Sequence, residues 1–181
     1  VFNDVEVRSG TVDMNCDVEV MNMLLLEELN LNSHNLLIQN PQGIDTQLSP
    51  MAMVISEDSL FEGSITVNVE SSTLPSIFPF GAGGERIYCE FKGNSGDAGQ
   101  VTMATYGTGS DNLPLPGNVS NLIGNGNLGT VSNNDAATVD RFWSITSTGT
   151  SVDALISINF LQSEMPNNAP FNDLSTIRAQ R

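Results

Sequence analysis

Basic side chains are scarce in this sequence. Lys and Arg together number 6 against 21 Asp and Glu, which gives a formal net charge of −15 at pH 7. Lys92 is the only lysine. A protein that holds nucleic acid or an anionic membrane surface through charge alone needs clustered cationic side chains. We therefore expect no nucleic-acid partner.

Long apolar segments are also missing. The longest apolar run covers residues 23–26, whereas a membrane-spanning helix needs about 20 predominantly apolar residues. We therefore expect no membrane insertion. The sequence opens with Val1 and lacks the Met and charged region of an export signal, so any such signal is expected to have been removed or to lie outside this sequence.

Cysteine and histidine are too few for several kinds of site. Cys16, Cys89 and His34 are the only residues of these two types, which excludes a disulfide framework and a zinc site built from them alone. The cysteines could pair, but each sits in an alternating apolar run, so we expect two buried free thiols. A serine hydrolase needs a base beside its nucleophile, and we interpret His34, between Ser33 and Asn35, as an exposed turn residue.

Aromatic residues make up only 6% of the chain. The best candidates for a glycosidase carboxylate pair are acidic residues of the first third of the chain, namely Glu27, Glu28, Glu57, Asp58 and Glu62. Glycosidases use such a pair beside the scissile bond and usually carry several aromatic rings that stack on sugars. We therefore expect no enzymatic activity.

Neutral polar residues are abundant instead. Asn, Ser, Thr and Gly are frequent while charged residues make up 15% of the chain. Such a surface is typical of secreted β-proteins and unlike the Lys- and Glu-rich surface of many cytosolic enzymes. The composition favours an extracellular location.

The first forty residues carry a faint repeat. The sequence of residues 4–7, Asp-Val-Glu-Val, returns at residues 17–20, and short alternating pieces follow at 29–32 and 36–38. Strands this short, recurring about every dozen residues, indicate a short β-solenoid or a tight meander. A helix over residues 21–31 is the alternative, because their composition suits one. We favour strand because the flanking pieces are β-like.

Later segments alternate more cleanly and predict antiparallel strands. Residues 63–70 are expected to form a half-buried strand, and residues 77–81 an edge strand or a strand end, because Pro79 cannot donate to a ladder. Two hairpins are predicted, one from residues 86–91 and 100–106 and the other from residues 139–146 and 154–160. The predicted fold is all-β, with a repeat-like ladder over residues 1–60 and an antiparallel immunoglobulin-like β-sandwich over residues 61–181.

Residues 139–146 hold the only Trp. With period two, Val139, Arg141, Trp143 and Ile145 share one face, and apolar residues occur on the other face too, which suits a central strand. A buried Arg141 would need a carboxylate or carbonyl partner, or would otherwise lie over an aromatic ring. We interpret the strand as structural core.

Two patterns bear on ligands. Residues 124–129 match GxGxxG, but no βαβ unit surrounds them, so we interpret their glycines as turn residues and expect no cofactor. Oxygen-rich loops offer weak calcium candidates at Asn94, Asp97, Asp111 and Asp135. Solvated turns are the alternative interpretation of these loops.

The order of segments resembles the large multidomain surface proteins of the Bacteroidetes that the type IX secretion system exports. The motifs are Phe78-Pro79-Phe80-Gly81, similar to an FPxG strand, and Val139 to Ile145, similar to a VxRxW strand. The resemblance implies a β-sandwich after a ladder of Asn- and Gly-rich rungs. It also implies a cell-surface protein with a structural, adhesive or gliding-related role, and transfers no catalytic residue.

One departure from that family concerns the C-terminus. Its members end in a sorting domain, which nothing here resembles, while Arg181 stands where a further strand would be expected. We therefore expect a piece of a longer polypeptide, or a last strand completed from elsewhere.

The sequence thus predicts a non-enzymatic extracellular structural or adhesive module. Its expected partners are other copies, neighbouring domains of a longer chain, or surface polysaccharide. The alternative is a carbohydrate-binding or accessory module of a secreted hydrolase, with Tyr88, Tyr106 and Trp143 as the ligand platform. Open strands over residues 1–38 and 174–181 would allow copies to join into a filament by strand addition. Mutual repulsion opposes this, and salt or calcium would screen it.

Overall fold

The computed structural model describes residues 1–8, 10–46, 52–57, 63–69, 74–120, 122 and 138–165. Within these ranges the chain forms strands and one 3-10 turn, Gln162–Glu164 (η2), and no α-helix. The all-β prediction is confirmed. No helix of the described ranges is long and apolar enough to cross a membrane.

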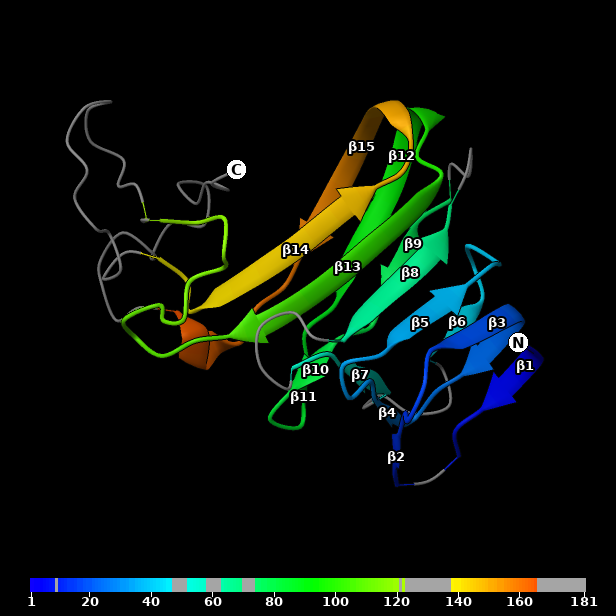
Figure 1. Cartoon of the computed structure of the whole chain (residues 1–181), viewed down its shortest axis with the longest axis horizontal. Helices are drawn as coiled ribbons and strands as arrows, with labels where there is room; N and C mark the ends of the chain where they lie inside the picture. The colour runs from blue at the N-terminus through cyan, green and yellow to red at the C-terminus, as the bar shows by residue number, and fades with distance from the viewer. Residues whose placement is uncertain are drawn as a thin grey trace. The chain divides into compact units, whose positions relative to one another are not determined.

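Figure 1 shows the strands coloured in chain order. In chain order they are β1 Phe2–Glu6, β2 Thr11–Asp13, β3 Val18–Leu25, β4 Glu28–Asn30, β5 Asn35–Ile38, β6 Ile44–Asp45, β7 Met53–Ile55, β8 Ser64–Asn68, β9 Ser76–Phe78, β10 Gly81–Ala82, β11 Glu85–Arg86, β12 Cys89–Asp97, β13 Gln100–Gly107, β14 Arg141–Ser147 and β15 Thr150–Ile158. Strands β3 and β4 occupy the segment for which a helix was the alternative, so the preference for strand is confirmed.

The first eight strands form a parallel ladder. Strands β1, β3, β5 and β8 are parallel neighbours in one sheet, while β2, β4 and β7 are parallel neighbours in a second. Apart from β6, which pairs with β3 in the first sheet, the strands alternate between the two sheets along the chain. A meander would pair its strands antiparallel. Of the two predicted alternatives, the structure therefore has the solenoid-like one.

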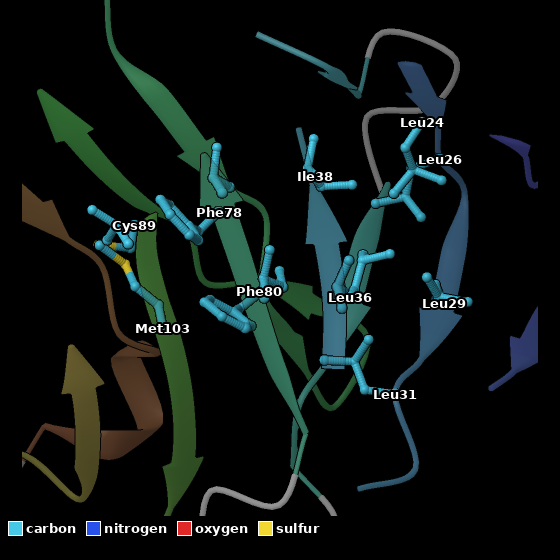
Figure 2. Packing of buried hydrophobic residues seen from close by; sticks show 14 of the residues in the cluster. Leu24, Leu26, Leu29, Leu31, Leu36, Ile38, Phe78, Phe80, Cys89 and Met103 are labelled. Carbon is cyan, nitrogen blue, oxygen red and sulfur yellow. The ribbon is translucent and has the colours of Figure 1, made fainter. Parts of the chain in front are cut away.

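Stacked apolar side chains hold the rungs together. Val20, Ile38, Val67 and Val101 are direct partners on β3, β5, β8 and β13, and each is at most 1% exposed. Successive side chains of a strand point to opposite faces, so one in-register column stays inside across all four strands. Figure 2 shows neighbouring members of the same cluster packed together. The ladder therefore continues without a break into the later strands.

Strand order explains where the antiparallel part begins. Strand β13 pairs antiparallel with β8, and β14 follows it as the last strand of the described sheet. A separate three-stranded sheet has the order β15-β12-β9. In the described part of the large sheet β14 is paired on one side, next to β13, and the central position expected for residues 139–146 stays a prediction. The edge position predicted beside Pro79 is confirmed in β9.

Both predicted hairpins are wrong. Strands β12 and β15 belong to the three-stranded sheet, whereas β13 and β14, which are joined to them by short turns, belong to the large one. Strand β12 also runs through residues 93–97, which lie between the two strands of the predicted hairpin. Each turn therefore carries the chain from one sheet to the other.

Hydrogen bonds between the two turns give the physical reason. The amide of Gly149 donates to the carbonyl of Ala98 at 2.9 Å, and the amide of Thr148 donates to the carbonyl of Gln100 at 3.0 Å. The Ser147 hydroxyl also donates to the carbonyl of Ala98 at 2.8 Å. Turns of this length usually close hairpins, but here their backbone groups bond to each other. The immunoglobulin-like arrangement of the sandwich stays a prediction.

The chain divides into two compact units. Unit 1 contains Val1–Tyr106 and Trp143–Asn159, and unit 2 contains Gly107–Phe142 and Phe160–Arg181. Strands β5 and β8 pair across residue 60, and the boundary expected there stays a prediction. The ladder and the antiparallel strands that extend it belong to the same unit.

Candidate functional site

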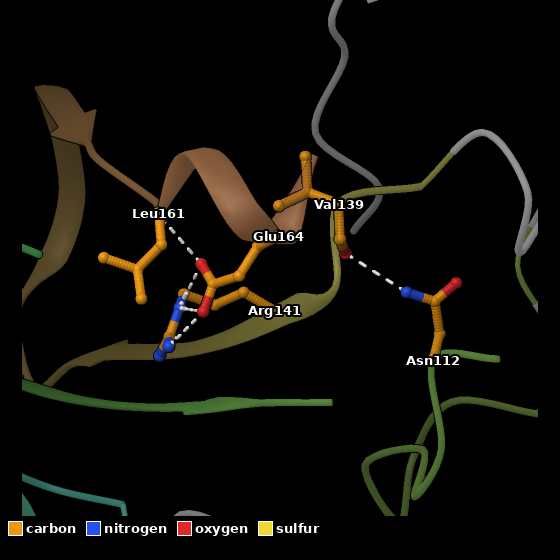
Figure 3. A network of polar contacts seen from close by, with 5 residues as sticks. All are labelled: Asn112, Val139, Arg141, Leu161 and Glu164. Carbon is orange, nitrogen blue, oxygen red and sulfur yellow. Dashed lines mark hydrogen bonds and ion pairs between the residues drawn. The ribbon is translucent and has the colours of Figure 1, made fainter. Parts of the chain in front are cut away.

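A buried ion pair is the main polar feature of unit 2. The Nε atom of Arg141 lies 2.9 Å from both carboxylate oxygens of Glu164, and Nη2 lies 2.5 Å from Oε1 (Figure 3). The two side chains are 1% and 10% exposed. The amide of Leu161 donates to Glu164 Oε2 at 2.8 Å. A buried arginine was expected to need such a partner, and the structure identifies it as Glu164.

A second group of polar contacts adjoins the ion pair. Asn112 is fully buried, and its Nδ2 donates to the carbonyl of Val139 at 3.2 Å and to Asp140 Oδ1 at 3.0 Å. The pKa of Asp140 is raised, mainly by burial and also by the charges of Glu164 and Asp111. The hydrogen bond from Asn112 acts in the opposite direction. The amide of Asp140 donates to the carbonyl of Glu164 at 2.9 Å. These contacts fix the start of β14 against the turn Gln162–Glu164.

The calcium candidates occupy different places. Asp97 Oδ1 accepts the amide of Gly99 at 2.8 Å, and Asp111 Oδ1 accepts the amide of Leu113 at 3.1 Å. Each carboxylate thus closes its own turn, a usual role for Asp. Asn94 lies within β12, and Asp135 lies outside the described residues. In the ranges that the structure describes, no three His, Cys, Asp or Glu side chains form a group that could hold a metal ion.

Two of the acidic residues considered for catalysis, Glu27 and Glu28, contact neighbouring rungs of the ladder, Glu28 through its carboxylate and Glu27 through its backbone carbonyl. The Glu28 carboxylate on β4 accepts a hydrogen bond from the Thr11 hydroxyl on β2, and the carbonyl of Glu27 accepts the amide of Met53 at 2.7 Å. Glu57 follows β7. Asp58 and Glu62, like the GxGxxG segment at residues 124–129, lie outside the described residues. The contacts of Glu27 and Glu28 connect neighbouring rungs.

His34 and the cysteines fit the expectations in part. His34 follows a turn, as expected, but is half-buried, with Nδ1 3.5 Å from Asp17 Oδ1. Both cysteines are free; Cys89 is buried as predicted, and burial raises its pKa to about 12. Cys16 is exposed, so the prediction for it is wrong. It lies in the bend between β2 and β3, where the alternation of a strand does not apply.

The three aromatic residues proposed as a sugar platform differ in exposure. Tyr106 is 2% exposed, and burial raises its pKa. Trp143 is half-buried and packs edge-on against Phe80, with ring centroids 5.7 Å apart and an interplanar angle of 70°. Of the three, only Tyr88 is exposed, at 37%. Two of these rings therefore contribute to packing.

The sequence did not predict the hydrogen bonds that connect polar side chains on the large sheet. Asn35 Oδ1 on β5 accepts from the hydroxyls of Ser64 at 3.0 Å and Thr66 at 2.9 Å on β8. Thr66 in turn shares a hydrogen bond of 2.9 Å with Thr102 on β13. The neutral polar composition was the available signal, but only the register of the strands shows which residues meet.

A parallel row runs through Gln39. Its Nε2 donates to Glu19 at 2.7 Å, and its Oε1 accepts from Asn68 Nδ2 at 3.2 Å. Both rows run across the strands, so each links rungs that are far apart in the sequence. We call the six residues Asn35, Ser64, Thr66, Thr102, Gln39 and Asn68, together with Glu19, the polar rows of the large sheet. Their side chains stabilise the ladder by bonding to one another.

No family model, no curated protein and no solved structure matches this chain.

Proposed function

We propose that the chain is a non-enzymatic structural or adhesive module of an extracellular cell-surface protein. The observation that carries the proposal is how the polar side chains are used. The polar rows of the large sheet, Glu28, Asp97, Asp111 and the Arg141–Glu164 pair all bond to groups of the chain itself. These contacts support a structural role more than a catalytic one.

Location and export route belong to the same proposal. The acidic, lysine-poor composition and the neutral polar side chains support exposure outside the cell. The proposal of export by the type IX system rests on the resemblance of the two motif segments, residues 78–81 and 139–145, to strands of those surface proteins. Phe78, Phe80 and Arg141 of these motifs are buried, so the motif residues serve packing and carry no chemistry over.

The carbohydrate-binding alternative has less support. Aromatic rings that stack on sugars must present a face to solvent, and Tyr106 and Trp143 are engaged in packing. A glycan array probed with the labelled chain tests this point. We expect no glycan binding that depends on Tyr88. Micromolar binding lost in the folded Tyr88→Ala variant would favour the alternative.

Surface labelling tests the proposed location. An antibody against the chain should label intact cells that produce it, and brief protease treatment of those cells should remove the signal. Permeabilised cells provide the control for total protein. Labelling that appears only after permeabilisation would contradict the proposal.

A further inference from the structure

The rung formed by β1 and β2 has an open edge. In the described sheet orders β1 is the end strand of the large sheet and β2 the end strand of the small parallel one, each paired only with the next rung. The next strands of the ladder, β3, β4 and β5, each have neighbours on both sides. We call β1 and β2 together the terminal rung.

Backbone geometry shows which groups the open edge presents. The amide of Val7 donates to the carbonyl of Leu25 at 2.9 Å, and the amide of Met14 donates to the carbonyl of Asn30 at 2.9 Å. In a parallel pair alternate residues bond to the same neighbour. The amides and carbonyls of Asp4, Glu6, Thr11 and Asp13 therefore point away from the ladder. An unpaired row of this kind is a template for another strand.

Two apolar columns end at the terminal rung. Phe2 lies over Val20 and Val12 lies over Leu29. Val20 is 0% and Leu29 5% exposed, whereas Phe2 is 54% and Val12 43% exposed. Each column is thus buried at every level except the last. A further rung with apolar side chains at the same two positions would complete the burial.

Charge limits what that further rung can be. Wherever an acidic residue occurs in the described registers, its direct partner is not acidic: Asp4 faces Met23, Glu6 faces Leu25 and Asp13 faces Asn30. The same holds for Glu19, Glu28, Asp45, Glu85, Glu90, Asp97 and Asp153. Like charges directly opposite destabilise a sheet. The side chains that face Asp4 and Asp13 should therefore be basic or neutral.

We propose that the terminal rung is an acceptor site for one more parallel rung from a partner segment. The segment is an extended β-arc with apolar side chains over Phe2 and Val12 and with basic or neutral side chains opposite Asp4 and Asp13. A second copy of this chain fits less well, because each copy carries a net charge of −15. The proposal concerns this edge alone and does not rest on an extracellular role.

A peptide with the geometry of a rung tests the proposal on the full chain. The probe is a synthetic copy of residues 18–30 in which Met23 and Asn30, the partners of Asp4 and Asp13 in the ladder register, are replaced by lysine. The matched control is the same peptide with glutamate at these two positions. We expect the lysine peptide to bind at least about ten times more tightly at low salt, since opposite charges attract across strands. Hydrogen exchange should slow at Asp4, Glu6, Thr11 and Asp13.

Charge-swap variants of the chain separate a specific edge from general attraction. The double variant Asp4→Lys with Asp13→Lys should lose the preference for the lysine peptide and bind the glutamate peptide better. Both residues are exposed, so circular dichroism should show an unchanged fold. A control double variant, Asp97→Lys with Asp153→Lys on β12 and β15, should keep the original preference.

Three results would overturn the proposal. The first is peptide binding without slower exchange on β1 and β2. The second is an equal loss of preference in both charge-swap variants, which would show attraction to net charge alone. The third is protection of β1 and β2 that rises with the concentration of the chain without peptide, together with dimers in light scattering, because the partner would then be a second copy.

Discussion

Removing Glu164 should destabilise the protein strongly. The Arg141 guanidinium makes three short contacts with this carboxylate, and its side chain is 1% exposed. Glu164→Ala therefore leaves a buried charge without the Glu164 carboxylate, and also removes the acceptor of the Leu161 amide. Breaking a buried pair from one side costs about 3–5 kcal/mol. For a chain of this size that loss lowers the melting temperature by roughly 6–20 °C.

Urea denaturation followed by tryptophan fluorescence measures this loss directly. Trp143 is the only Trp and lies two residues after Arg141 in β14, so its emission should report on the strand. Arg141→Met should cost as much as Glu164→Ala. The exposed pair Arg8 with Glu6, whose side chains are 78% and 34% exposed, is the matched control. Arg8→Ala should cost about 1 kcal/mol or less.

A double variant decides whether the two charges act as a pair. Arg141→Met with Glu164→Leu removes both charges and keeps apolar volume, and such replacements are often neutral or stabilising. We expect the double variant to be more stable than either single one. Single losses below about 1 kcal/mol, or a double loss equal to the sum of the singles, would refute the reasoning.

Three further predictions concern other parts of the chain. Trp143→Ala should lower the free energy of unfolding by about 2–3 kcal/mol in urea, less than for a fully buried aromatic because Trp143 is half-buried; a loss under about 1 kcal/mol would contradict its packing role. Gly81→Ala should lower the free energy of unfolding by about 1–3 kcal/mol in thermal melts, because the added Cβ would lie 2.8 Å from the Cβ of Met53. The control Gly117→Ala, which has open space around it, should lower it by less. Iodoacetamide at pH 8 should modify the exposed Cys16 and spare Cys89, whose pKa is raised to about 12 by burial; mass spectrometry of the native protein counts the adducts, and equal labelling of both would show that Cys89 is accessible.

The alternation of apolar and polar residues predicted where most strands lie but not which strands pair with one another. Val67 and its neighbours on β8 alternate clearly in the sequence, and β8 lies where it was expected. The two short turns at residues 97–100 and 147–150 have hairpin lengths, yet each connects different sheets. The difference comes from hydrogen bonds between turns that are about fifty residues apart. No local pattern contains that information.

The ion pair was predictable from one side only. Arg141 was expected on the face that holds Trp143, where burial would require a carboxylate or carbonyl partner and an aromatic ring was the alternative. Glu164 lies 23 residues later, outside any strand, and is placed by the turn Gln162–Glu164. The chain has 21 acidic residues, so the sequence alone could not single this one out.

The same registers explain how so acidic a chain can stack its rungs. Adjacent strands lie about 4.8 Å apart, so two carboxylates in register would repel strongly. Each acid of the described registers faces a neutral residue instead, and some, such as Glu19 with Gln39 and Glu28 with Thr11, accept a hydrogen bond from the next strand. A carboxylate thus bonds to a neighbouring rung where it would otherwise repel one. The pattern also restricts growth at the open edge, because a rung that placed acids over Asp4 and Asp13 would break it.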